Sequence, residues 1–205
     1  NLDRTVKEDN TLVTEYDTRV NDLLIQRVKE AFPEHAVFGE ESEFVGAENA
    51  EYVWTCDPID GTKAFTMSVP LITLMLSLVY KGEPIVGLIY DPILDRIVTA
   101  EKGEGALFND EKVSHPPHTH IKNAYIAYSV NMKYNYVNMF GIWTEFTKHN
   151  VHFSYTHIGM AGLLLASGNI DAIVMPFFSH YEFLTLKLIL SESGFVMTNL
   201  LGQPI

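Results

Sequence analysis

The sequence predicts a single domain with a layered α/β fold. A length of 205 residues falls in the usual range of one domain, and 47% hydrophobic with 12% aromatic residues can form a substantial core. Strand patterns follow one another closely in the first part of the chain, and strands alternate with helices in the second. We therefore expect two halves within this domain, about residues 1–120 and about residues 121–205.

Acidic residues outnumber basic ones, with 26 Asp and Glu against 14 Lys and Arg and a net charge of −12. The surface field should repel nucleic acid, and no basic stripe with interleaved aromatic residues is present. No uncharged apolar stretch reaches the roughly 18 residues of a membrane span, and the first residues are too polar for a secretory signal. The single cysteine, Cys56, excludes an intramolecular disulfide and a cysteine-based zinc cluster. We expect a cytoplasmic protein without nucleic-acid or membrane partners.

The first predicted helix runs from near residue 17 to residue 31, because apolar residues recur there at helical spacing and Pro33 follows. The polar segment upstream, residues 7–17, has two interpretations: a mobile flap, or an N-terminal arm that ends in a helix cap. A short buried strand is expected at residues 36–38.

A meander of strands follows at residues 71–80, 85–90 and 96–100. Turn sequences at 81–84 and 91–92 separate them, which indicates antiparallel pairing. Residues 71–76 barely alternate between apolar and polar, so we expect that strand to be buried on both faces. A tight turn is expected at residues 102–106.

The sequence His-Pro-Pro-His-Thr-His at residues 115–120 is the expected boundary between the two halves. Three histidines can bind a metal, but the Pro-Pro pair interrupts their spacing and no acid accompanies them, so a surface linker is preferred. Beyond it we expect strands at 124–128, 151–155, 171–175 and 195–198, and helices at 136–149, 159–167 and 182–193.

The chemistry is expected at residues 52–63, where an apolar strand ends in two carboxylates. Asp57 and Asp60 flank Pro58 and are followed by Gly61 and Thr62. The residues from Asp60 onward can open a short helix, whose free N–H groups favour an anion. Carboxylates beside an anion site suggest metal ions that bridge protein and phosphate. The alternative is an Asp-rich turn with a helix cap and no chemistry.

Glu40 is a further candidate, because Gly39-Glu40-Glu41 follows the short strand at 36–38 as the two aspartates follow theirs. Paired glutamates are usually a solvated face. Two neighbouring strands that both end in acids can, however, bring Glu40, Asp57 and Asp60 together.

In order and spacing, Gly39-Glu40-Glu41-Ser42 and Asp57-Pro58-Ile59-Asp60-Gly61-Thr62 resemble the inositol monophosphatase family of metal-dependent phosphomonoesterases. Residues 13–17, 102–106 and 168–172 also fit, so the resemblance covers essentially the whole chain. It implies an αβαβα sandwich, a homodimer, and lithium-sensitive hydrolysis of a small phosphorylated metabolite. It also implies two or three Mg²⁺ ions, for which Mn²⁺ can substitute.

The resemblance also implies roles for individual residues. The metal ligands it implies are Glu40, Asp57, the Ile59 carbonyl, Asp60 and Glu182. Thr62 and Asp17 would orient the attacking water with Glu40 as a further catalytic residue, and the N–H groups of Gly61 and Thr62 would hold phosphate oxygens. This set agrees with the hard oxygen ligands and the helix start noted above.

The chain departs from the family pattern at Glu182, where the family has an aspartate. The extra methylene moves the carboxylate by about 1.5 Å if the backbone is unchanged, and Mg²⁺ tolerates little departure from its octahedral geometry. The second metal would then bind weakly, through water, or not at all. Met160, Met175 and Phe195 also replace usual residues, and we expect each change to touch the substrate side or the second metal.

Short stretches such as Lys63-Ala64-Phe65 and Tyr181-Glu182-Phe183-Leu184 look most like the histidinol-phosphate phosphatase branch. The candidate substrates are histidinol phosphate, inositol phosphate and a nucleotide 3′-phosphate. The alternative hypothesis, motivated by Glu182, Met160 and Met175, is a catalytically weak relative that binds metal or phosphate and acts through a protein partner.

Overall fold

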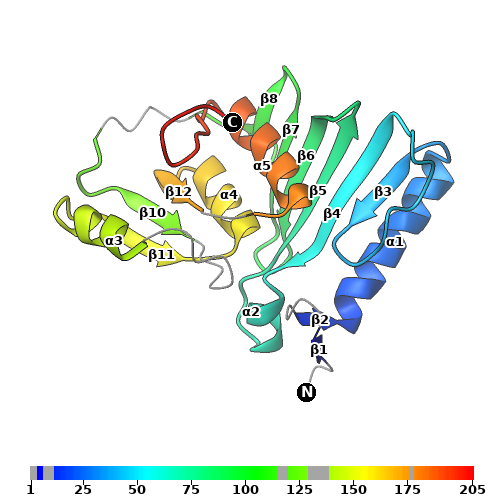
Figure 1. Ribbon diagram of the computed structural model, residues 1–205, viewed down its shortest axis with the longest axis horizontal. Coiled ribbons are helices and arrows are strands. Elements are labelled where there is room, and N and C mark those ends of the chain that lie inside the picture. The colour runs from blue at the N-terminus through cyan, green and yellow to red at the C-terminus, as the bar shows by residue number, and fades with distance from the viewer. Residues whose placement is uncertain (1–3, 7–11, 115–119, 129–138, 176–177) are drawn as a thin grey trace.

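The larger of two main sheets organises the computed structural model, which describes residues 4–6, 12–114, 120–128, 139–175 and 178–205 (Figure 1). Its seven strands lie in sequence order: β3 (Ala36–Gly39), β4 (Tyr52–Asp60), β5 (Thr73–Tyr80), β6 (Glu83–Asp91), β7 (Arg96–Glu101), β8 (Gly105–Phe108) and β9 (Glu111–Lys112). β3 pairs with β4 in parallel, and every later pair is antiparallel. The predicted meander is confirmed.

Helix α1 (Glu15–Ala31) covers β3 and β4 on one face of this sheet (Figure 1). It begins with a capping box, in which Thr14 and Asp17 exchange side-chain and backbone hydrogen bonds. Just before it, β1 (Arg4–Val6) pairs antiparallel with β2 (Leu12–Thr14). Residues 7–11 of the upstream segment lie outside the described part of the chain; the contacts of residues 12–17 agree with an arm that ends in a helix cap.

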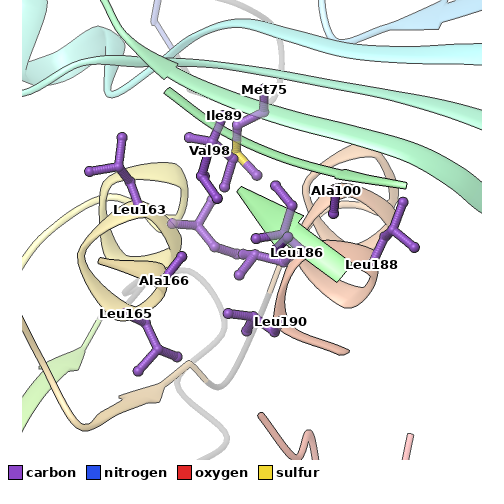
Figure 2. Packing of buried hydrophobic residues seen from close by; sticks show 13 residues of the cluster. Met75, Ile89, Val98, Ala100, Leu163, Leu165, Ala166, Leu186, Leu188 and Leu190 are labelled. Carbon is purple, nitrogen blue, oxygen red and sulfur yellow. The ribbon is translucent and has the colours of Figure 1, made fainter. Parts of the chain in front are cut away.

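The main hydrophobic core lies on the opposite face, between the sheet and helices α4 (Ile158–Ala166) and α5 (His180–Glu192). Figure 2 shows leucines of both helices, among them Leu163 and Leu186, gathered under Met75 and Ile89 of the sheet. Each such side chain stabilises the fold by about 1.5–3 kcal/mol when fully buried. This packing fixes α4 and α5 against the strands that carry the acids.

Strand β5 differs from its prediction in burial. Its residues alternate between buried and half-buried, with Thr73, Met75, Ser77 and Val79 on the covered side. The prediction of burial on both faces was wrong, because α4 and α5 cover one face whereas α1 lies over the neighbouring β3 and β4.

A smaller parallel sheet completes the layers, with strands in the order β11 (His152–Tyr155), β10 (Tyr125–Tyr128) and β12 (Ala172–Val174). Helix α3 (Met139–Thr147) packs on this sheet through Trp143 against Tyr128. The layers therefore run helix, sheet, helices, sheet, helix (Figure 1), which is the αβαβα arrangement that the resemblance implied.

One further prediction has a definite outcome and another is untested. The strand at residues 195–198 was wrong: Thr198 forms only an isolated bridge with Pro204, because no described strand lies beside this segment to complete a ladder. The predicted linker falls, apart from His120, on residues 115–119, which lie outside the described part of the chain. None of the described helices combines the length and apolar character that crossing a membrane requires.

Candidate active site

The parallel pairing of β3 and β4 brings Glu40 beside Asp57. Gly39 is in register with Cys56, and the Glu40 N–H donates to the Cys56 carbonyl at 2.9 Å. Parallel strands end at the same edge of a sheet, so acids that follow them meet there. Cys56 itself is buried, and burial raises the pKa of its thiol, in agreement with its interpretation as a core residue.

An irregularity in β4 turns both aspartates toward the same side. Asp57 pairs with Met75 and Asp60 with Thr73, so three steps along β4 match two steps along β5. Side chains of a regular strand alternate, and residues three apart would face opposite sides; one extra residue corrects this. The Ile59 N–H donates to Asp57 Oδ1 at 3.1 Å and closes the turn. The backbone therefore places Asp57 and Asp60 together.

Glu182, from the first turn of α5, joins these two aspartates. One carboxylate oxygen of each of Asp57, Asp60 and Glu182 lies within 4.8 Å of the others. Glu182 reaches this cluster although its Oε2 also accepts the Ser179 N–H and hydroxyl in the capping box of α5. The longer side chain therefore still brings a carboxylate to the cluster.

The two aspartates of the cluster are buried, Glu182 is half-buried, and their negative charges repel one another. Burial raises the pKa of Asp57 well above its usual range, and the charges of Glu40, Asp60 and Glu182 raise it further. Burial and the charge of Glu182 raise the pKa of Asp60 to about 7, against the lowering effect of its hydrogen bonds. Three oxygen donors with an excess of negative charge are the donor set that a hard divalent cation fits.

Asp60 is held in place by donors from two other elements. Asp60 Oδ2 accepts the Gly159 N–H at 2.7 Å and the Thr73 hydroxyl at 2.9 Å. A Cβ on Gly159 would lie 2.2 Å from Thr73 Oγ1 and 2.9 Å from Asp60 Oδ2. Glycine is therefore required where α4 approaches β4.

Thr62 and Asp17 form a second pair beside the cluster. Thr62 Oγ1 lies 3.2 Å from Asp17 Oδ1 and 3.1 Å from the Ile59 carbonyl oxygen, both acceptors for its hydroxyl. Asp17 Oδ2 accepts the Thr14 N–H at 2.8 Å, and Asp17 is only 1% exposed. The capping box of α1 therefore fixes the carboxylate that holds the Thr62 hydroxyl.

Gly61 precedes the short helix α2 (Thr62–Thr66) and has a φ of 101°, which a residue with a side chain rarely adopts. A Cβ there would lie 2.7 Å from His157 Cδ2 and 2.8 Å from the Leu71 carbonyl. The predicted short helix after Asp60 is present, and Gly61 is its N-cap residue.

Comparison with known proteins gives the family of this chain. The inositol monophosphatase family matches residues 1–205. The chain belongs to the inositol monophosphatase family. It is 30% identical over 203 residues to the bifunctional phosphatase IMPL2 of Arabidopsis thaliana, covering 96% of this chain and 57% of that protein. It is also 28% identical over 198 residues to the inositol-1-monophosphatase of Bacillus subtilis, covering 95% of this chain and 75% of that one.

Solved structures share the fold. The suhB protein of Bartonella henselae superposes with a TM-score of 0.91 at 23% identity, over 99% of this chain and 79% of that one. An IMPase/NADP phosphatase complexed with Mg²⁺ and phosphate gives 0.86 at 24%, over 100% and 77%. The chain spans 57% of the length of the Arabidopsis relative and 75% of the Bacillus one.

Three replacements relative to the family pattern are buried or pack against the hydrophobic core. Met160 is buried at 2% exposure, and its sulfur lies 3.7 Å from Arg96 Nη2. Met175 and Phe195 pack against the hydrophobic core and line an apolar cavity of about 480 Å³ beside α5. Both belong to apolar packing, and their expected contact with the substrate or the second metal stays a prediction.

Sequence reasoning missed three residues of the site: Thr73, Gly159 as a donor, and His157. Gly159 lies 99 residues from Asp60 in the chain, and no local pattern connects them. A small residue at the start of a predicted helix was the only signal for Gly159. No sequence pattern indicated a role in the site for Thr73 or His157.

Proposed function

We propose that this chain is a Mg²⁺-dependent phosphomonoesterase that hydrolyses a small soluble phosphate monoester. The observation that carries the proposal is the carboxylate cluster of Asp57, Asp60 and Glu182 beside the Thr62–Asp17 pair. Membership in the inositol monophosphatase family supports it. Two buried carboxylates and one half-buried carboxylate, with one oxygen of each within 4.8 Å of the others, repel one another and destabilise a fold unless a cation binds them, so their presence is best explained by function.

The residues proposed to hold the cations are Glu40, Asp57, the Ile59 carbonyl, Asp60 and Glu182. A bound divalent cation would lower the pKa of a coordinated water and neutralise charge on the phosphate. Asp60 is kept in one orientation by Gly159 and Thr73, so it would present a fixed oxygen to the cation. We propose two or three ions, with Mn²⁺ able to replace Mg²⁺.

Thr62 and Asp17 are proposed to position the attacking water. When the Thr62 hydroxyl donates to Asp17, its oxygen keeps lone pairs that can accept a hydrogen bond from water. The N–H groups of Gly61 and Thr62 would hold phosphate oxygens at the start of α2. In this arrangement the protein mainly positions the reactants.

The substrate is proposed from chemistry and relatives. Candidates are inositol phosphate, histidinol phosphate and a nucleotide 3′-phosphate; one structural neighbour was solved with D-inositol-1-phosphate and another with NADP and Ca²⁺. A neighbour was also solved as a LiCl-soaked inhibitory complex, and we propose that lithium inhibits this chain too. We further propose a homodimer that does not bind nucleic acid.

Phosphate release from a panel of these monoesters, with and without Mg²⁺, tests the proposal. We expect Mg²⁺-dependent turnover, with a loss of about 100-fold or more in Asp60→Asn because one proposed ligand loses its charge. Asp110→Asn, at an exposed turn, is the matched control and should leave turnover unchanged. Activity that survives Asp60→Asn unchanged would contradict the mechanism.

A second candidate function is a catalytically weak relative that acts by binding a protein. Glu182 motivates it, because the Ser179 cap already uses one of its oxygens; several curated relatives carry the name Nus factor SuhB. Absence of phosphate release at saturating Mg²⁺, with no gain of activity in Glu182→Asp, would favour this candidate over the enzyme.

A further inference from the structure

His157 lies at the edge of the candidate active site and has no structural task there. It is the N-cap residue of α4, but its side chain makes no capping hydrogen bond; only its backbone carbonyl acts, accepting the Ala161 N–H at 2.9 Å. Among the described residues the imidazole has no hydrogen-bond partner, and its ring contact is with Tyr155 at 6.3 Å between centroids. A half-buried ring with two free nitrogens is available to a ligand.

The imidazole lies directly over the phosphate-binding turn that we propose. A Cβ built on Gly61 would lie 2.7 Å from His157 Cδ2 and 3.0 Å from Nε2, so this edge of the ring is in contact with Gly61. Asp60, the residue before Gly61, is bound to Gly159, two residues after His157. The same backbone contacts that place Asp60 therefore place His157.

Burial and a neighbouring cation keep the imidazole of His157 neutral near pH 7. Burial lowers the pKa of His157, and the Lys63 ammonium from α2 lowers it further. A neutral imidazole donates from one nitrogen and accepts at the other, which suits a hydroxyl group. The negative phosphate would instead be held by the N–H groups of the turn and by the cations.

We propose that His157 determines specificity by hydrogen-bonding a hydroxyl of the group esterified to the phosphate. This inference rests on the proposed function and deepens it: the favoured substrates are monoesters of polyols that carry a hydroxyl next to the ester oxygen. Sites built to bind a hydroxyl discriminate strongly against analogues that lack it, because their polar groups are then left unpaired.

Two esters, two variants of His157 and one control variant test the proposal. Glycerol 2-phosphate has hydroxyls beside the ester carbon, whereas phenyl phosphate has none. In His157→Phe, which keeps a ring but no donor or acceptor, we expect kcat/KM for glycerol 2-phosphate to fall by about 10-fold and that for phenyl phosphate by less than about 2-fold. His157→Gln should recover part of the loss, because its amide can reach the Nε2 position. His152→Phe, on the exposed strand β11, is the control and should change neither.

Equal losses for both esters in His157→Phe, or no loss for either, would overturn the proposal. A weaker inhibition by inorganic phosphate in His157→Phe would also overturn it, since the contact would then be with the phosphate.

If the wild-type protein releases phosphate from neither ester nor from any monoester of the panel above, the proposed function fails and the contact is decided by NMR. The imidazole signal of His157, identified by its absence in His157→Phe, is followed with Mg²⁺ present. Displacement by glycerol 2-phosphate and not by phenyl phosphate supports the contact, and no displacement contradicts it.

Discussion

Replacing Asp60 by asparagine should stabilise the metal-free protein at pH 8 while it removes cation binding. The introduced amide can still accept from Gly159 and Thr73 through its carbonyl oxygen, so the contacts that hold the side chain are retained. The change removes a charge that faces Asp57 and Glu182. A site selected to bind a cation should be destabilising without it.

The pKa of Asp60 gives the size of this effect. In the folded chain its pKa is about 7, against an ordinary value of 3.8, so between these values the folded state keeps a proton that the unfolded state has lost. The stabilising protonation is complete below about pH 4 and is lost as the pH rises through 7. Three pH units at about 1.4 kcal/mol each give about 4 kcal/mol, or on the order of 10 °C in Tm.

Thermal unfolding of both proteins in EDTA between pH 4 and pH 8 measures it. We expect equal stability near pH 4 and an advantage for Asp60→Asn that grows toward pH 8. With Mg²⁺ the wild type should gain stability and the variant should not. A variant that is less stable than the wild type at pH 8 in EDTA would refute the reasoning.

A second buried aspartate provides the matched control. Asp91 is 1% exposed and binds the Arg96 guanidinium, with Nη2 at 2.6 Å and Nε at 3.1 Å from Oδ2. Asp91→Asn leaves that cation without its partner and should destabilise the fold by about 3 kcal/mol. The same substitution at two buried aspartates therefore has opposite signs, set by the charge that each one faces.

Three further predictions concern the same site. Mg²⁺ should bind more tightly as the pH rises toward 8, because both Asp57 and Asp60 must release a proton first; the proton of Asp60 alone gives up to about 10-fold per pH unit below 7. Calorimetric titration at pH 6, 7 and 8 checks this, and constant affinity would contradict it. Gly159→Ala should cost about 2–4 kcal/mol in chemical denaturation, because its Cβ would lie 2.2 Å from Thr73 Oγ1, and adding Thr73→Ala should restore part of that loss. Thr62→Val should leave the Tm within a few degrees but reduce phosphate release about 100-fold, whereas Thr62→Ser should retain most of it.

The sequence predicted the parts of the site that follow local rules. Acids at the ends of two strands indicated the meeting of Glu40 and Asp57, and Gly61 before a polar residue indicated a short helix. The extra residue in β4 that turns Asp57 and Asp60 to one side was not predictable, because it depends on pairing with β5. The same holds for Gly159, which only the packing of α4 brings to Asp60.

Apolar segments were the less reliable part of the prediction. Residues 195–198 have the composition of a strand, yet a strand also needs a neighbour, and composition does not report one. The burial of β5 on one face only was missed for a related reason, since the helices that cover that face, α4 and α5, begin far along the chain at Ile158 and His180. Met175 and Phe195 likewise belong to packing that local sequence does not reveal.

Through the hydrogen bond from Gly159 to Asp60, cation binding at the site and the packing of α4 affect each other. Any cation that favours one orientation of Asp60 must also favour the position of α4 that supplies its N–H, by the same free energy in both directions. Slower exchange of the Gly159 amide proton on addition of Mg²⁺ would measure that coupling. Substitutions deep in the leucine core under α4 and α5 would then change the affinity for a cation that none of those residues touches.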